Sequence, residues 1–212
     1  MRQKWNWRCV LLPVSLATAS SVVVLSSAPT ALAATCPPPP SASKTFSAWG
    51  DLHSYVPVTD GGFEPISTGS LQQPWSLSRS GASIVSGNEP WHVDGNSKDS
   101  HALSIQTGGQ ATSACTTAPL VTSVLRFFIK NTGATSGELH VQLLVNGGKN
   151  GILDGGYITA GSTWQPTAIL YLPWANPLSG AVNLQVVLTP LGAGASFQVD
   201  DIYLDPCLAK LG

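Results

Sequence analysis

The amino-acid sequence predicts an all-β protein, an antiparallel β-sandwich of the jelly-roll kind. Short runs in which apolar and polar residues alternate recur along the chain, the cleanest being Val182, Leu184, Val186 and Leu188. Glycine, proline, asparagine and aspartate separate these runs at intervals of about eight to fifteen residues. No stretch combines helical periodicity with helix caps. These patterns predict roughly eight to ten strands in two sheets, each with one face turned inward.

The first part of the chain has the features of a secretory signal peptide. Arg2, Lys4 and Arg8 precede an apolar run over 10–25, and the small residues of 31–33 form a cleavage site. The apolar run is shorter than the ~20 residues of a membrane-spanning helix, so we expect no membrane contact after cleavage. We therefore expect a secreted protein that is extracellular or loosely associated with the cell wall.

Behind the signal peptide (1–33) we expect a proline-rich leader over 34–45 and a single β-sandwich domain over 46–208. The four consecutive prolines of 37–40 favour an extended leader. Phe46, Trp49 and Tyr55 follow it, and we expect these aromatic rings to hold the leader against the sandwich.

Charge and composition limit the class of partner. All 11 acidic residues but only seven of the ten basic ones follow the signal peptide, which gives the remaining chain a net charge of −4. The basic residues are not clustered, so nucleic acid is not an expected partner. The many serine, threonine, asparagine and glycine residues favour contact with polar, uncharged ligands.

Three cysteines remain after the signal peptide, an odd number for an oxidising compartment. One disulfide is expected, and spacing leaves two pairings open. Cys36–Cys115 closes a loop of roughly 80 residues, and the chain-entropy model assigns such a disulfide a stabilisation of ~4–5 kcal/mol. Cys36–Cys207 joins the two ends of the domain instead. The remaining cysteine can be a free thiol or link to another chain.

The strands can be placed in order from the alternation and the turn residues. Gly108-Gly109 predicts a hairpin between the third and the fourth strand, and Pro166 predicts an edge strand or a bulge. Trp75 and Trp164 lie within strands and are expected in the core. The expected strands cover 75–77, 82–85, 102–105, 110–114, 123–130, 139–145, 152–159, 164–172, 182–188 and 195–206.

The last strand changes the face of its apolar residues. Phe197 and Val199 have one parity, whereas Ile202 and Leu204 have the other. A strand with one buried face needs an extra residue for such a change, so we predict a bulge at Asp200-Asp201. Its expected neighbour is the turn 60–64, where the domain begins.

Several of these stretches resemble known proteins. Gly61-Gly62-Phe63-Glu64, followed by Trp75-Ser76-Leu77, resembles the opening of jelly-roll carbohydrate-binding modules of the galactose-binding-like class, and 197–202 resembles their closing strand. More narrowly, 36–206 is similar to a family of small secreted bacterial proteins to which no function is assigned. The motifs that carry this resemblance are 86–91, 99–103, 126–133, 164–167 and 199–206. The resemblance implies a Cys36–Cys115 disulfide and leaves Cys207 unexplained.

The resemblance also implies a structural calcium ion between the opening turn and the closing strand. Glu64 and Asp201 would be its side-chain ligands, with backbone carbonyls near Asp60 and within 99–102. Calcium prefers six to eight oxygen ligands, which carboxylates and carbonyls supply. Alternatively, the two carboxylates are hydrogen-bonded to backbone or solvated.

Two tryptophans in loop-like stretches are candidates for sugar contacts. Trp91 is accompanied by Asn88, Glu89 and His92, and Trp174 lies between two prolines. A sugar ring stacks on an indole while amides and carboxylates bind its hydroxyls; alternatively, either ring packs in the core. We expect a non-catalytic binding module for extracellular or cell-wall glycan.

Catalysis is not expected from the motifs. Ser83 lacks the second glycine and the helix of a nucleophile elbow. Asp99, Ser100 and His101 are neighbours whose side chains alternate in direction along a strand, so they do not form a relay. The alternative function is a structural or protein-interaction component of the cell envelope, with Cys207 as the link to a partner.

Overall fold

A computed structural model describes residues 36, 41–64, 75–78, 80–119, 123–172 and 181–205. They belong to one compact unit, residues 35–212. The predicted signal peptide, the prolines of 37–40, Trp174 and Cys207 lie outside the described residues. Where the chain is described, no helix is long and apolar enough to cross a membrane.

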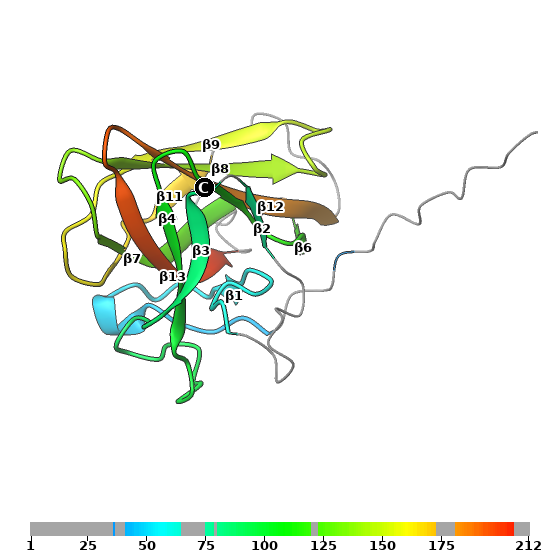
Figure 1. The fold of residues 1–212 in the computed structure, drawn as a ribbon. Coiled ribbons are helices and arrows are strands. Elements are labelled where there is room, and N and C mark those ends of the chain that lie inside the picture. The colour runs from blue at the N-terminus through cyan, green and yellow to red at the C-terminus, as the bar shows by residue number, and fades with distance from the viewer. Residues whose placement is uncertain are drawn as a thin grey trace, which may run out of the picture. The chain divides into compact units, whose positions relative to one another are not determined.

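Strands dominate the described chain, and its one helical segment is the 3₁₀ turn η1, Ser47–Trp49. Figure 1 shows the strands in two layers. The strands are β1 Val56–Pro57, β2 Ser76–Ser78, β3 Ala82–Ser86, β4 His101–Gln106, β5 Gln110–Thr112, β6 Thr116–Pro119, β7 Ser123–Asn131, β8 Glu138–Val145, β9 Ile152–Ile158, β10 Gln165–Pro166, β11 Leu170–Leu172, β12 Ala181–Leu191 and β13 Ser196–Asp205.

The strand order is that of a jelly roll. The seven-stranded sheet has the order β10-β7-β13-β4-β3, with β1 on β13 and β11 on β7. The six-stranded sheet has the order β2-β5-β12-β8-β9, with β6 on β12. From β4 onward the chain passes repeatedly from one sheet to the other, and the last strand, β13, returns to lie between β4 and β7. This double Greek key confirms the predicted fold class.

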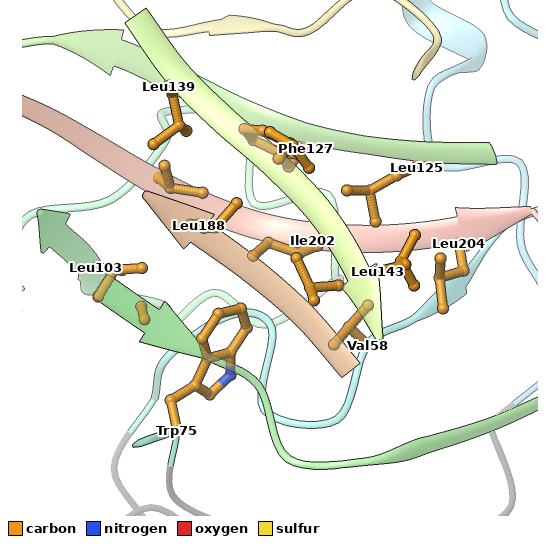
Figure 2. Close-up of a cluster of buried hydrophobic side chains, with 14 of the residues drawn as sticks. Val58, Trp75, Leu103, Leu125, Phe127, Leu139, Leu143, Leu188, Ile202 and Leu204 are labelled. Atoms are coloured by element: carbon orange, nitrogen blue, oxygen red, sulfur yellow. The ribbon is translucent and has the colours of Figure 1, made fainter. Parts of the chain in front are cut away.

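The main core lies between the two sheets, where the alternating apolar residues meet (Figure 2). In β8, all four inward residues, Leu139, Val141, Leu143 and Val145, are fully buried. Trp75, just before β2, is 4% exposed, which confirms its predicted place in the core. Burying one such side chain contributes about 1.5–3 kcal/mol, so this alternation supplies the main driving force for the fold.

The hairpin predicted at Gly108-Gly109 is wrong. β4 pairs with β3 and β13 in one sheet, whereas β5 pairs with β2 and β12 in the other, so these glycines carry the chain between the layers. They allow two backbones to touch: a Cβ on Gly109 would lie 2.5 Å from the carbonyl carbon of Gly81. The glycine signal reports this close approach rather than a two-residue turn.

The single strand predicted over 164–172 is also divided. β10 and β11 are short separate strands, and both pair with β7 at the edge of the seven-stranded sheet, as Pro166 leads us to expect. Trp164 precedes β10, is half-buried and packs at the edge of the buried cluster around Phe46 and Phe128, so its predicted core position is met only in part. The Lys130 ammonium lies 4.9 Å from the centre of its ring.

The bulge predicted in the last strand is confirmed. The register of β13 against β7 shifts between Asp200 and Tyr203, and Asp201 has a φ of 48°. Ile202 then returns to the core, and its backbone bonds to the opening turn at Gly61. A Cβ on Gly61 would lie 2.8 Å from the Ile202 carbonyl oxygen, so this approach requires glycine.

The outer face of the seven-stranded sheet is covered by the segment 41–55, called here the N-terminal arm. Phe46 and Tyr55 of the arm are fully buried, and the Phe46 ring stacks on Phe128 of β7 at 5.4 Å. The Arg126 guanidinium of β7 lies 2.6 Å from Asp51 of the arm. Phe46 and Tyr55 therefore contact the sandwich as predicted, whereas the prolines of the leader that they were expected to hold lie outside the described residues.

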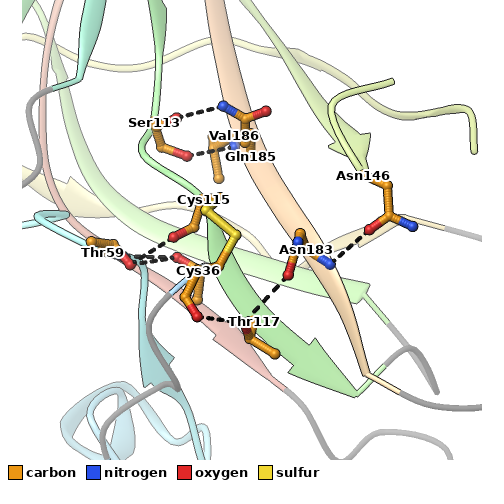
Figure 3. The surroundings of a disulfide bond; sticks show 10 residues. Cys36, Thr59, Ser113, Cys115, Thr117, Asn146, Asn183, Gln185 and Val186 are labelled. Carbon is orange, nitrogen blue, oxygen red and sulfur yellow. Dashed lines mark hydrogen bonds between the residues drawn. A yellow bond between two sulfur atoms is a disulfide. The ribbon is translucent and has the colours of Figure 1, made fainter. Parts of the chain in front are cut away.

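A disulfide joins Cys36 to Cys115, the pairing that the resemblance implies, with the two Cα atoms 5.3 Å apart. Hydrogen bonds surround it (Figure 3). The Thr117 hydroxyl donates to the Cys36 carbonyl at 3.2 Å, and the Thr59 hydroxyl donates to the Cys115 carbonyl at 3.1 Å. The start of the described chain is therefore fixed beside β6.

Candidate functional site

Two regions carry side chains that the fold does not need for its core, and the first is the long connection between β3 and β4. This segment, Gly87 to Ser100, is called here the 87–100 loop. It is closed at its base because the Gly87 amide donates to the Ser100 carbonyl at 2.7 Å. The flanking residues Ser86 and His101 are paired across the two strands.

Carboxylates from this loop meet those of the β13 bulge inside the protein. Oxygen atoms of Glu89, Asp99 and Asp201 all lie within 4.8 Å of one another, and these residues are 0, 4 and 2% exposed. Asp200, also fully buried, accepts a hydrogen bond from the Glu89 amide at 3.1 Å. These four residues are called here the acidic cluster.

The hydrogen-bond donors around the acidic cluster leave two of its oxygen atoms without a partner. The Glu89 carboxylate accepts the amides of Trp91 and Val93, and Asp99 accepts from the Asn88 side-chain amide at 2.9 Å. Oδ1 of Asp99 and Oδ2 of Asp201 are buried without any hydrogen-bond partner. Among the described residues, no lysine or arginine forms an ion pair with these carboxylates.

The electrostatics reflect this accumulation of buried charge. Burial raises the pKa of Asp99 to about 7, and the adjacent Glu64 carboxyl contributes to the rise. Burial also raises the pKa of Asp200 to about 9, with Asp99 adding repulsion, and that of Asp201 to about 10, with Asp200 adding repulsion. Oxygen atoms that are buried, close together and unpartnered match the donor set of a hard cation such as Ca²⁺.

The two predicted calcium ligands occupy different positions. Asp201 belongs to the acidic cluster. Glu64 instead accepts the backbone amides of Ser100 at 2.7 Å and His101 at 2.6 Å, so it fastens the end of the loop. Asp201 and Glu64 also line an open cavity of about 720 Å³ between the opening turn and the loop.

The predicted sugar contacts are not gathered on one surface. Trp91 is 44% exposed, and its ring lies 5.1 Å from Trp49 and 5.3 Å from Phe128, centre to centre. Glu89 is inside the protein, and Asn88 is engaged with Asp99. His92 is exposed, with a φ of 48°. Trp174 lies outside the described residues.

The second region is the outer face of the six-stranded sheet, called here the polar face. No described strand packs over it. Tyr157 of β9 is 58% exposed, and its ring lies nearly parallel to that of His140 on β8, at 4.7 Å and 20°. Uncharged hydrogen-bonding side chains extend from this pair across the sheet. The polar side chains of this face are Gln110, Thr112, His140, Gln142, Asp154, Tyr157, Gln185 and Thr189, and the apolar residues Leu144, Ile152 and Val187 lie among them.

Local structure fixes the aromatic pair on the polar face. A bulge in β9 shifts its register against β8 beside Gly156, which has a φ of 80°. The Asp154 carboxylate accepts the Gly156 amide at 2.8 Å and contacts His140 Nε2 at 3.0 Å. These two hydrogen bonds lower the pKa of Asp154. The ring of Tyr157 is therefore held in place while most of it remains in solvent.

The polar face was not predicted from the sequence, although a signal exists. His140 and Gln142 are the polar partners of the alternation in β8, and such residues are typical of any solvated face. Only the pairing of β8 with β9 brings Tyr157 beside them.

Comparisons with known proteins add the following. No protein-family profile and no curated protein matches this chain. Similar solved structures include TmCBM61 in complex with β-1,4-galactotriose (15% identity, 69% of this chain and 95% of that chain, TM-score 0.43). A family 11 carbohydrate-binding module from Clostridium thermocellum, in complex with a β-1,3-1,4-mixed-linked tetrasaccharide, is 16% identical (66% and 92%, TM-score 0.37).

An enzymatically active domain is also among the similar structures. It belongs to tailspike protein 4 of bacteriophage CBA120 and is 18% identical, covering 69% of this chain and 21% of that chain with a TM-score of 0.39.

Proposed function

We propose that this protein is a secreted, non-catalytic glycan-binding protein and that the polar face is its binding surface. The observation that carries the proposal is the exposed, fixed ring of Tyr157 beside a field of amide and hydroxyl side chains. An aromatic ring offers an apolar surface for the C–H face of a sugar. Glutamine and threonine side chains both donate and accept hydrogen bonds, as sugar hydroxyls require.

The shape and charge of the polar face suit a neutral polymer. Neighbouring strands lie about 4.8 Å apart, so side chains on β9, β8, β12 and β5 form a row roughly 15 Å long. Such a row accommodates several sugar rings rather than one. Asp154 is the one carboxylate among the residues that define the polar face, so the face has little net charge to attract an ionic polymer.

The placement of carboxylates on this face supports a binding role without catalysis. Glycosidases hold two carboxyl groups about 5–9.5 Å apart. Asp154 is in register with Gln142, four residues along β8 from the exposed Glu138. That spacing along a strand corresponds to roughly 13 Å, which is too far for the pair.

The test is binding of the chain from residue 34 onward to insoluble polysaccharides and to cell walls. The ligands in the similar structures suggest β-1,4-galactan and mixed-linkage β-glucan as the first probes. We expect Tyr157→Ala to weaken binding by about tenfold or more, equivalent to ~1.4 kcal/mol, with an unchanged Tm. The matched control is Tyr171→Ala, because Tyr171 is 62% exposed but lies on β11 of the other sheet.

Two outcomes would contradict the proposal. If no glycan binds, the polar face is not a glycan surface, and a role in protein association takes its place. If Trp91→Ala removes binding and Tyr157→Ala does not, the ligand binds at the 87–100 loop instead.

We also propose that the acidic cluster holds a structural Ca²⁺, with Glu89, Asp99 and Asp201 as the residues that would bind it. The ion would neutralise buried negative charge and join the loop to β13. Calcium is expected to raise the Tm and chelator to lower it, because a ligand that binds only the folded state stabilises it. An identical Tm in calcium and in chelator would rule out a structural ion here.

A further inference from the structure

We infer that cation binding by Glu89 and Asp99 orders the 87–100 loop and thereby holds Trp91 against Trp49 and Phe128. The inference rests on the structural ion of the proposed function. It goes further because it couples ion binding to the order of the loop and to the position of an exposed aromatic residue.

The first step is that the loop carries ligands near both of its ends. Glu89 lies two residues after the start of the loop and Asp99 one residue before its end, and both reach Asp201 on β13. Two oxygen atoms of the acidic cluster are buried without a hydrogen-bond partner. They are Oδ1 of Asp99 in the loop and Oδ2 of Asp201 in β13. An ion among these atoms therefore bridges both ends of the loop and the sheet.

The second step is that Glu89 also sets the position of Trp91. Its carboxylate accepts the Trp91 amide, and it accepts the Val93 amide at 3.0 Å. The backbone of this turn is thus wrapped around the same carboxylate that faces the ion. Any displacement of Glu89 moves the Trp91 ring relative to Phe128, 5.3 Å away.

The third step is that few other contacts hold the loop. It contains no strand, and its main apolar contacts are those of Trp91, 44% exposed, and of the half-buried Val93. Segments with few buried apolar contacts open locally at low cost. Without an ion, the buried oxygen atoms of Asp99 and Asp201 have no shared partner that joins the loop to β13, so ion binding decides how often the loop opens.

Glu64 provides the discriminating comparison. Its side chain is 25% exposed, and its oxygens already accept the Ser100 and His101 amides. Glutamine keeps one acceptor oxygen, so Glu64→Gln is expected to retain ion binding. Glu89→Gln and Asp99→Asn are expected to lose it.

The experiment measures two quantities on the chain from residue 34 onward. Calorimetric titration with Ca²⁺ reports binding, and hydrogen exchange reports opening of the 87–100 loop. Calcium at about 100 times its dissociation constant should slow exchange of the Trp91 and Val93 amides by up to about 100-fold. The internal control is the 146–151 turn between β8 and β9, where exchange should not change.

Variants separate the ligands from the rest of the surface. Asp99→Asn should abolish both calcium binding and the protection, whereas Asp154→Asn, which changes an exposed carboxylate on β9, should retain both. Trp91→Phe should still bind calcium and show the same protection. The unaltered chain can itself be compared in calcium and in chelator, so the test does not depend on whether a variant folds.

The outcomes distinguish the proposals. Calcium binding with loop protection supports the inference. Calcium binding without protection overturns the inference and leaves the structural ion. Absence of calcium binding overturns the ion and the inference together, whereas glycan binding at the polar face is measured independently and can still stand.

Discussion

The two outer faces of this sandwich differ in how far they are covered, although apolar and polar residues alternate along the strands of both sheets. On β7, the outward residues Val124 and Phe128 are buried beneath the N-terminal arm. On β8, the outward residues His140 and Gln142 remain partly exposed, and no described strand covers them. The N-terminal arm therefore covers the apolar outer face, whereas no described strand covers the polar outer face.

We therefore expect the covered face to contribute to stability and the polar face to contribute to binding. Side chains on the covered face contribute buried apolar area and an internal ion pair, so their loss should destabilise the fold. Side chains on the polar face are solvated before and after a substitution, so their loss should change binding alone. Four substitutions test this separation, from the largest expected effect to the smallest.

Phe46→Ala should have the largest effect. Phe46 is fully buried, stacks on Phe128, and lies 4.6 Å beneath the Arg126 guanidinium. Removing a buried phenyl ring costs about 3–5 kcal/mol, which urea unfolding would measure. Leu52→Ala is the control, because Leu52 of the same arm is 67% exposed and should cost less than about 0.5 kcal/mol. Equal losses for the two variants would show that the arm does not pack as described.

Asp51→Asn should destabilise the protein by about 2–3 kcal/mol by weakening its pairing with the buried Arg126. Burial raises the pKa of Asp51, but hydrogen bonds from Tyr55, from the His53 amide and from Arg126 outweigh it, so the net pKa is lowered. The stabilisation is therefore present above the unfolded pKa of 3.8 and lost as the pH falls through the folded value. The difference in unfolding free energy between the two proteins should be constant from about pH 7 to 5 and shrink below about pH 4. A difference that is unchanged at low pH would contradict this assignment.

Trp91→Ala should cost about 1–2 kcal/mol, less than Phe46→Ala, because 44% of Trp91 is already in solvent. Denaturant unfolding in saturating calcium would measure it. A cost as large as that of Phe46→Ala would mean that Trp91 belongs to the buried cluster beneath the N-terminal arm, which contains Phe46, Tyr55, Val124, Phe128 and Tyr203, rather than lying at its edge.

Tyr157→Phe should have the smallest effect. It removes a solvated hydroxyl and keeps the ring, so stability should change by less than about 0.5 kcal/mol. Glycan binding should weaken by no more than about threefold, because the ring rather than the hydroxyl makes the stacking contact. A loss as large as that of Tyr157→Ala would move the contact from the ring to the hydroxyl.

The sequence predicted the parts of the fold that depend on local pattern. Alternation placed β7, β8 and β12 correctly, and the change of parity after Val199 located the bulge in β13. The short strands β1 and β6 were not predicted, because they are two and four residues long and have no pattern of their own. The glycines at 108–109 were misinterpreted because a close approach between backbones and a hairpin turn use the same residue type.

The acidic cluster could be predicted only in part because it is assembled over a long range. Asp200-Asp201 was visible as an interruption of a strand, and the resemblance pointed to Asp201. Glu89 and Asp99 lie about 100 residues away in sequence, in a loop without periodicity. Their proximity to Asp201 results from the pairing of β4 with β13, which no local motif encodes.

The position of the disulfide determines how the domain responds to mechanical force. Tension applied through the leader passes from Cys36 directly to Cys115, so the arm, the 87–100 loop and β1 to β5 lie inside a covalent ring and carry no load. The segment between the two cysteines, which are 79 positions apart in the sequence, is withheld from stretching, which shortens the fully extended chain by roughly 270 Å. In an oxidising environment, a pull would reach the β6–β12 side of the sandwich first, while the 87–100 loop stays inside the closed ring.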